Sequence, residues 1–250
     1  MSAFDIIDSH LHTGIQNVNW RWEDLRPLLL AAGITGAGAI PPVEDVYDRY
    51  DPEFTDTPAW QECRRRAHNY LLGLNDPEIR VFPYFFVWND FAWEDLGPKY
   101  AAIKWHRHPD EPEYDYASPK CREFLEQVRK KGLPILLEES LENTLFFLKE
   151  MAPDLPVIIP HLGALNGGYR ALDAAGVWSR EMVWADTALA GMAEIKDYLR
   201  RCGSERLMFG SDYPFGRPDT ELAKIMSLDL PEAEIRAILG DNFRRLCRWE

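Results

Sequence analysis

The sequence predicts an α/β fold: a (β/α)8 barrel of the TIM type, with room for some distortion of the regular barrel and with extra helices at its C-terminal end. Short apolar runs recur along the 250 residues, each bounded by Pro, Gly or charged residues. Stretches with helical spacing lie between them, and strands that alternate with helices pair in parallel through right-handed crossovers. Eight such units in about 250 residues match the dimensions of a barrel. The alternative is an open doubly wound sheet, which normally carries a glycine-rich turn after its first strand, whereas here that position reads His10-Leu11-His12-Thr13-Gly14.

The expected strands follow one another in the order of the apolar runs. They are Phe4 to Asp8, Ile34 to Ile40, Arg80 to Val87, Ala101 to Trp105, Pro134 to Glu138, Pro156 to Pro160, Met182 to Asp186 and Arg206 to Gly210. No repeat, low-complexity tract or Gly/Ser linker divides the chain. Residues 1–250 are therefore expected to form a single domain.

The expected helices fill the gaps between these strands. Helical spacing marks Trp22 to Ala32, Ala59 to Leu74, Ser118 to Lys131, Leu141 to Met151 and Met192 to Cys202. The tail from Leu222 to Glu250 is expected to form two or three short helices. Pro231 would start one of them, because proline is favoured in the first turn of a helix.

The acidity of the chain argues against several classes of partner. The formal net charge is −13 and the sequence pI is about 5.0, whereas nucleic-acid-binding proteins usually carry a basic stripe. No segment approaches the roughly 18 apolar residues that a membrane span needs. We therefore expect neither nucleic acid nor a membrane as a partner. An acidic surface also repels anions at long range, so an acidic substrate would have to be met by cations inside a pocket.

Cysteine usage and the N-terminal residues bear on the compartment. The four cysteines are widely scattered and form no C-x-x-C pair, which indicates neither a disulfide framework nor a thiolate zinc site. Asp5 and Asp8 interrupt the first apolar stretch, which argues against a secretory leader. A cytoplasmic protein is expected.

Two histidines one residue apart end the first apolar run, Ile6-Ile7-Asp8-Ser9-His10-Leu11-His12. Side chains alternate across a strand, so His10 and His12 project from one face and can bind one ion, while Ile7 and Leu11 face the other way. Such a pair alone is weak evidence, because histidines at strand ends are commonly solvated or packed in a core. Partners elsewhere in the chain have to support the metal hypothesis.

Polar residues at the other strand ends supply those partners. The C-terminal ends of barrel strands converge on one face, where active sites are found. The residues at these ends are His10, His12, Lys104, His106, Glu138, Glu139, His161 and Asp212. Lys104 and His106 are two apart, so both can point into the mouth while Ile103 and Trp105 face the helices. Four of the six histidines lie at these ends, which packing alone does not explain.

Four of these segments carry a family resemblance. They are Ile7-Asp8-Ser9-His10-Leu11-His12, Ile103-Lys104-Trp105-His106, Ile159-Pro160-His161-Leu162-Gly163 and Phe209-Gly210-Ser211-Asp212-Tyr213-Pro214. In this order they resemble the amidohydrolase superfamily, specifically its amidohydrolase-related (amidohydrolase 2 type) metal-dependent hydrolases and decarboxylases. The last segment is the most specific, and the resemblance runs the length of the chain. It implies a barrel with one divalent metal ion, zinc first and manganese or iron as alternatives, and a small-molecule substrate. Barrels of this kind often form homodimers.

The resemblance also implies roles for single residues. His10, His12 and Asp212 would ligate the ion, and Asp212 would take the proton of the attacking water and pass it to the leaving group. His161 would polarise the substrate carbonyl or act as a further ligand. Taken alone, Asp212 also fits a turn cap before Tyr213 and His161 fits a structural role.

Strand five departs from the family pattern, which usually has a metal-binding histidine where this chain has Glu138. Three interpretations follow. Glu138 ligates the ion itself, which favours harder ions such as Mn or Fe alongside Zn. Alternatively the barrel has lost its metal and binds substrate directly. In the third, Glu138 supports a ligand or caps a helix, and Glu139 or water completes the site.

Four residues are candidates for contact with substrate. A lysine at the barrel mouth is costly to bury without an anion, so Lys104 would hold a substrate carboxylate or pair with Glu138, and His106 lies beside it. Arg217 is expected on a loop at the site, where it would clamp a carboxylate, an exposed loop arginine being the alternative. Trp88 would wall a pocket for a ring or pack in the core.

A second metal ion is not expected. No clear ligands for one are evident, so a carboxylated Lys104 bridging two ions, as used elsewhere in the superfamily, is not favoured. His108 precedes Pro109 in a loop, and His68 lies in a helical segment beside Arg64 to Arg66. Both histidines are expected at the surface, and the arginine cluster fits the solvated face of a helix.

The leading expectation is a metal-dependent hydrolase of a small-molecule amide, ester or lactone. The same framework supports a non-oxidative decarboxylase of a small aromatic or unsaturated carboxylic acid. A metal-free barrel that binds a ligand without turnover is the alternative from another class, prompted by the missing histidine on strand five.

Overall fold

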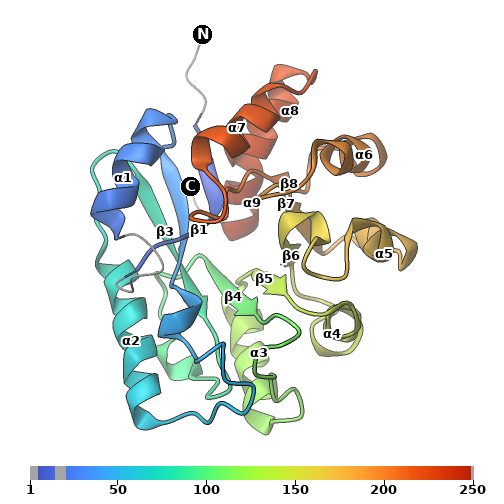
Figure 1. Ribbon diagram of the computed structural model, residues 1–250. Coiled ribbons are helices and arrows are strands. Elements are labelled where there is room, and N and C mark those ends of the chain that lie inside the picture. Colours follow the sequence, from blue (N-terminus) through green and yellow to red (C-terminus); the bar gives the residue numbers. More distant parts are fainter. Residues whose placement is uncertain (1–4, 15–20, 249–250) are drawn as a thin grey trace.

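Eight parallel strands form the core of the computed structural model, which describes residues 5–14 and 21–248. The strands pair in sequence order from β1 to β8 and curl into a nearly closed barrel with helices around it (Figure 1). They are β1 Ile7–His12, β2 Gly36–Ile40, β3 Arg80–Phe86, β4 Ala102–His106, β5 Ile135–Glu138, β6 Val157–Ile159, β7 Val183–Asp186 and β8 Leu207–Met208. The prediction of a (β/α)8 barrel is confirmed. Strand β1 begins later than expected, and Phe4 lies outside the described residues.

Helices follow most strands, as the spacing of apolar residues predicts. They are α1 Trp22–Ala31, α2 Pro58–Gly73, α3 Pro119–Lys131, α4 Leu141–Phe146, α5 Tyr169–Ala174, α6 Met192–Cys202, α7 Pro218–Met226, α8 Glu232–Arg236 and α9 Asn242–Cys247. The short helix α5 was not expected. Within the described residues no helix is long and apolar enough to cross a membrane.

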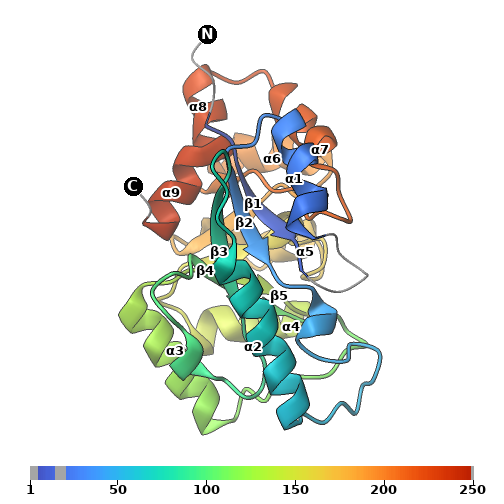
Figure 2. The same cartoon turned by 90° about the vertical axis from the view of Figure 1, so that its left-hand side faces the viewer.

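The barrel is distorted between β3 and β4. From Phe86 to Ala102, where every residue is described, the only helical piece is the 3₁₀ turn Trp93–Asp95. The three C-terminal helices are the expected addition, although α7 begins at Pro218 rather than Leu222. Helix α7 lies beside α1 (Figure 2), so the segment after β8 packs against the first helix of the barrel.

Strand β8 is short, and side-chain and loop contacts join it to β1. The Ser9 backbone N–H and hydroxyl both donate to the Phe209 carbonyl, at 2.9 and 2.7 Å. Beyond the strand, Leu11 forms a bridge with Tyr213. This seam places the end of β1 directly beside the loop that carries Asp212.

A bulge in β1 lies opposite Gly38. Asp8 pairs with Ala37 and Leu11 with Ala39, so Ser9 and His10 together face Gly38 alone. The Ser9 carbonyl of the bulge accepts a hydrogen bond from the Tyr84 hydroxyl at 2.8 Å. A Cβ atom at position 38 would lie 2.6 Å from this carbonyl oxygen and 3.1 Å from the Tyr84 hydroxyl. The absence of a side chain at Gly38 therefore makes room for the bulge and for its hydrogen bond.

The alternation in β4 directs side chains as expected. Trp105 is fully buried and packs outward against Phe124 of α3 and Phe147, with ring centroids 6.3 and 5.1 Å away. Its neighbours Lys104 and His106 point into the barrel mouth, where both contact Glu138. The strand thus separates a hydrophobic layer from a polar one.

His68 is buried, so its expected place at the surface was wrong. It lies on α2, where its Nε2 accepts the backbone N–H of Phe86 at 3.0 Å and its ring stacks on Phe85. Arg64 is buried too, because Asp56 and Asp90 pair with its guanidinium. Burial, aided by the charge of Arg64, lowers the pKa of His68 to about 3.

We expect His68 to make the fold acid-sensitive. The unfolded chain binds a proton at His68 below pH 6.5 while the folded chain does not, so stability is lost as pH falls below 6.5. Between pH 7 and pH 5 this loss amounts to about 2 kcal/mol. His68→Gln keeps a hydrogen-bond acceptor but cannot titrate. Urea unfolding at the two pH values should show a smaller loss in the variant, and equal losses would contradict this role.

Candidate metal centre

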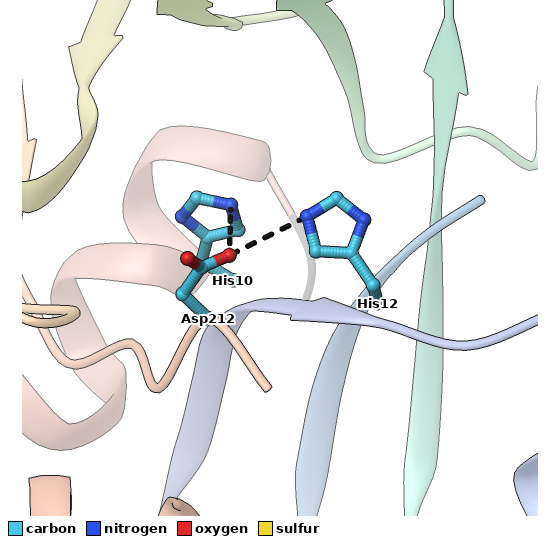
Figure 3. A group of neighbouring side chains, drawn as sticks. All are labelled: His10, His12 and Asp212. Atoms are coloured by element: carbon cyan, nitrogen blue, oxygen red, sulfur yellow. Dashed lines mark ion pairs between the residues drawn. The ribbon is translucent and has the colours of Figure 1, made fainter. Parts of the chain in front are cut away.

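The polar strand ends converge on one buried cluster at the C-terminal face of the barrel. The cluster comprises His10, His12, Lys104, His106, Glu138, His161 and Asp212, all buried. One oxygen of Asp212 faces both histidines of β1 (Figure 3), at 3.3 Å from His10 Nε2 and 3.4 Å from His12 Nε2. The structure therefore brings together the residues that the sequence selected as metal ligands.

Three histidine rings point their Nε2 atoms toward this centre, because their Nδ1 atoms are hydrogen-bonded on the outer side. The Nδ1 atoms of His10, His12 and His161 lie 3.0, 3.1 and 3.0 Å from the Asp186 carboxylate, the Pro41 carbonyl and the Ala188 carbonyl. These partners accept hydrogen bonds, so each Nδ1 donates. Each Nε2 is then directed inward.

This set of donor atoms fits a divalent ion. Ligand atoms about 2.0 to 2.1 Å from a tetrahedral zinc ion lie about 3.3 Å from one another. The distances from the Asp212 oxygen to His10 Nε2 and His12 Nε2 match this value, and His10, Glu138 and His161 form a second group of metal-ligand types. Imidazole with carboxylate is a ligand set that zinc, manganese and iron all accept.

Glu138, rather than Glu139, points into the site. Its Oε2 lies 2.9 Å from Lys104 Nζ and 3.6 Å from His161 Nε2. Its Oε1 lies 2.7 Å from His108 Nε2 and 3.3 Å from His106 Nε2. Burial opposes its ionisation, but Lys104 and His106 outweigh this and hold the pKa of Glu138 well below its usual value. Lys104 thus pairs with Glu138, one of the two partners expected for it.

Glu139 belongs to the outer side of the strand. Its carboxylate accepts from the Tyr116 hydroxyl at 2.8 Å and from the Ser140 backbone N–H at 2.8 Å. Burial raises the pKa of Glu139. The carboxylate therefore stabilises the start of α4 rather than the site.

The charges in the centre differ between neighbouring residues. Burial and the charge of Lys104 hold the pKa of His10 well below its usual value, so its ring is neutral. Burial alone would lower the pKa of His161, but contact with Glu138 outweighs it and raises the pKa to about 9. Burial likewise opposes ionisation of Asp212, yet His10 and His12 lower its pKa. The centre thus offers a neutral ligand, an imidazolium and an ionised carboxylate within a few ångströms.

A pocket of about 170 Å³ opens onto this centre. Its lining residues are His12, Val43, Arg49, His106, His108, Glu138, Leu165, Leu189, Asp212 and Phe215. The volume suits a small molecule with a polar group near the centre and an apolar part near the rim. Phe215 at this rim is 66% exposed and meets the edge of His12.

Two of the four expected substrate contacts lie elsewhere. Trp88 is buried behind Tyr47, on which it stacks at 4.1 Å, so it contributes to the core. Arg217 is exposed, and its guanidinium pairs with Asp219 at 2.9 Å instead of facing the pocket. The cation that lines the pocket is Arg49, on the loop between β2 and α2.

A further group of metal-ligand types, His106, His108 and Glu111, adjoins the pocket. The guanidinium of Arg49 already supplies a positive charge within this group. Its Nε donates to Glu111 at 2.7 Å and its Nη2 to His108 Nδ1 at 3.0 Å. The Tyr47 hydroxyl also donates to Glu111, at 2.6 Å. The positive charge of Arg49 makes this group unsuited to a second ion.

Three site residues escaped sequence reasoning. His108 was expected at the surface, yet it contacts Glu138; the spacing His106-x-His108 repeats the His10-x-His12 pattern and would have identified it. Asp186 ends an expected strand and would have been found by the same strand-end rule. Arg49 gave no such signal, because its loop has no periodic pattern.

The chain resembles known proteins in sequence pattern and in fold. The sequence model of a family described as amidohydrolase matches residues 7–249. No curated protein sequence matches significantly. Among solved structures, a 2,6-dihydroxybenzoate decarboxylase in complex with 2,6-dihydroxybenzoate is similar at a TM-score of 0.71 and 17% identity, over 99% of this chain and 100% of the other.

Two further structures share the fold. A 5-carboxyvanillate decarboxylase from Sphingomonas paucimobilis has a TM-score of 0.73 at 12% identity, over 98% of this chain and 99% of the other. A dihydroxybenzoic acid decarboxylase from Polaromonas sp. JS666, with bound manganese and the inhibitor 2-nitroresorcinol, has a TM-score of 0.67 at 14% identity, over 99% and 97% of the two chains. At these identities the likeness shows a shared fold.

Proposed function

This chain belongs to the amidohydrolase family, and from that membership we propose that it is a metal-dependent hydrolase of a small-molecule amide, ester or lactone. One observation carries the proposal. At the base of a pocket, one Asp212 carboxylate oxygen lies 3.3 Å from His10 Nε2 and 3.4 Å from His12 Nε2. The Nδ1 atom of each ring is hydrogen-bonded on the other side.

In the proposed reaction the chain supplies ligands, a base and an acid. His10, His12 and Asp212 would hold the ion, and Glu138 would balance charge beside it as a further ligand or as the partner of Lys104. A bound divalent ion supplies Lewis acidity and lowers the pKa of water to about 7. Asp212, whose own pKa is lowered, is ionised at neutral pH and so can accept the proton of the attacking water. His161, as an imidazolium, would donate a hydrogen bond to the substrate carbonyl as negative charge develops on it.

A decarboxylase is the second candidate, and one observation favours it. His161 is 1% exposed and protonated at neutral pH, so it can protonate a carbanion left by loss of carbon dioxide. The fold neighbours include decarboxylases of aromatic acids. His106 and Lys104 would then face the substrate carboxylate from β4.

The two candidates differ in where oxygen from water goes. We would remove metal with a chelator, restore Zn, Mn or Fe, and screen esters, lactones, amides and aromatic carboxylates in ¹⁸O-water. A hydrolase incorporates ¹⁸O into the released acid and is silent without metal. Carbon dioxide release without ¹⁸O in the product would establish the decarboxylase instead. Failure to bind any of the ions and to turn over any substrate would favour the ligand-binding barrel.

We propose zinc as the physiological ion, with manganese or iron as alternatives, in a cytoplasmic homodimer. The two imidazoles of His10 and His12 together with one carboxylate form a ligand set that zinc commonly takes. The four cysteines, Cys63, Cys121, Cys202 and Cys247, are all unpaired, which favours a reducing compartment. Metal analysis of purified protein tests the ion, and light scattering tests the dimer.

Arg49 is proposed to bind an anionic group of the substrate in place of Arg217. Among the described residues that line the pocket, Arg49 is the one lysine or arginine. For an acidic substrate we expect Arg49→Gln to raise KM about tenfold or more, as loss of a charge-assisted hydrogen bond does. Arg217→Gln is the matched control, with KM expected within twofold of the wild type. A larger increase in KM for Arg217→Gln than for Arg49→Gln would indicate that Arg217 binds the anionic group instead.

A further inference from the structure

One carboxylate at the end of β7 contacts two histidines of the centre. Asp186 Oδ2 lies 3.0 Å from His10 Nδ1. Asp186 Oδ1 accepts the backbone N–H of His161 at 2.8 Å and that of Ala188 at 3.1 Å. Asp186 and His10 are both 0% exposed. Both groups are shielded from bulk solvent, and each orients the other.

The backbone at His161 adopts an unfavourable conformation that this carboxylate stabilises. His161 and Leu162 have φ values of +57° and +48°, in the left-handed region that non-glycine residues rarely adopt. The Asp186 carboxylate holds the N–H of the first of them, and the Ala188 carbonyl accepts from the His161 ring. The segment 186–188 therefore sets both the His161 backbone and its ring.

We propose that Asp186 is a positioning residue that fixes His10 in the tautomer with hydrogen on Nδ1, so that the Nε2 lone pair is available to the ion. The inference rests on the proposed metal centre, although its tautomer part concerns the free protein. Burial raises the pKa of Asp186, while His161 and two backbone N–H groups favour its ionised form. The ionised carboxylate accepts hydrogen bonds only, so His10 beside it places its proton on Nδ1. A hydrogen on Nε2 would instead point into the ligand cluster and block that site.

Asp186→Asn tests this with little change in shape. Two backbone N–H groups, from His161 and Ala188, require an acceptor at the Oδ1 position, so the amide oxygen remains there. The amide NH₂ then faces His10 Nδ1 and can only donate to it. His10 is forced into the tautomer with hydrogen on Nε2, which cannot bind a metal ion.

Asp8→Asn is the matched control. Asp8 is also 0% exposed, and its Oδ1 accepts the backbone N–H groups of His10 and Ser211 at 3.2 and 2.9 Å. The variant removes a buried carboxylate beside the same histidine but leaves the ring partner intact. Burial raises the pKa of Asp8 to about 7, so this control tests the loss of a buried carboxyl group that holds the backbone beside His10, rather than the loss of a full negative charge.

Zinc affinity is measured by competition with a chromogenic chelator. We expect zinc to bind Asp186→Asn about 10- to 100-fold more weakly than the wild type, and Asp8→Asn within threefold of it. Asp186→Asn within threefold of the wild type, or equal losses in the two variants, would overturn the inference. If the wild type binds no zinc, the proposed metal centre fails, and the tautomer measurement alone then decides about Asp186.

The ¹⁵N chemical shifts of His10 in the metal-free protein report the tautomer directly. In the wild type we expect a protonated Nδ1 and an unprotonated Nε2, and in Asp186→Asn the reverse. A merely structural role would leave this pattern unchanged. Protonation at Nε2 in the wild type would overturn the proposal even if the variant does not fold.

Discussion

Replacing Asp212 by Asn is expected to lower kcat by about three orders of magnitude. The carboxylate is the proposed proton acceptor, and a positioned base contributes about 10²- to 10⁴-fold. Its oxygen also lies 3.3 and 3.4 Å from His10 Nε2 and His12 Nε2, so zinc affinity should fall with it. Measuring kcat in saturating zinc separates the two roles, because added zinc restores occupancy but not the base.

Asp219→Asn provides the control for this variant. It removes a carboxylate from the same stretch of chain, but one whose side chain is 54% exposed and pairs with Arg217. We expect kcat within twofold of the wild type. An Asp212→Asn enzyme that retains a tenth or more of wild-type kcat in saturating zinc would rule out Asp212 as the base.

Gly38→Ala is expected to destabilise the fold by about 3 kcal/mol, because forcing a methyl group into close-packed surroundings typically costs 1 to 3 kcal/mol or more. Here the obstacle includes backbone: the new Cβ would lie 2.6 Å from the Ser9 carbonyl oxygen. Relief requires the bulge to move, which displaces His10 and weakens the hydrogen bond from Tyr84. Zinc affinity should therefore fall together with the free energy of unfolding.

Gly73→Ala is the matched substitution in open space. Nothing lies within 4 Å of a Cβ at Gly73, in the last turn of α2. This variant should be neutral or more stable by up to about 1 kcal/mol, since alanine restricts the unfolded chain. Urea unfolding of both variants checks the pair, and a Gly38→Ala protein as stable as Gly73→Ala would contradict the close approach.

The strands and the ligand cluster were predictable because both depend on local patterns. Apolar runs bounded by turn residues marked all eight strands, and parallel strands carry their C-terminal residues to one face. His10, His12 and Asp212 meet for that reason. The choice between Glu138 and Glu139 needed the structure, because a strand end is uncertain by a residue or two.

Loop residues could not be placed in the same way. Arg217 is close to Asp212 in sequence, yet its side chain turns to Asp219. Trp88 follows β3, but Tyr47 covers it from a loop far away in the chain. Arg49 reaches the pocket through that same loop. Such positions depend on tertiary contacts between irregular segments, for which the sequence offers no periodic signal.

The seam between β1 and β8 joins segments that are synthesised far apart, so the site can form only after β8 has been made. The Ser9 hydroxyl and its acceptor Phe209 are 200 residues apart. His10 and His12 lie on the β1 side of this seam, and Asp212 lies on the β8 side. A nascent chain that ends before Asp212 holds two of these donors and lacks the third. Bringing such distant segments together carries a loop-closure entropy cost, and an ion bound by both would offset part of it. Binding of the ion by all three donors would then require the chain as far as Asp212, and translation products that stop before it would lack this stabilisation.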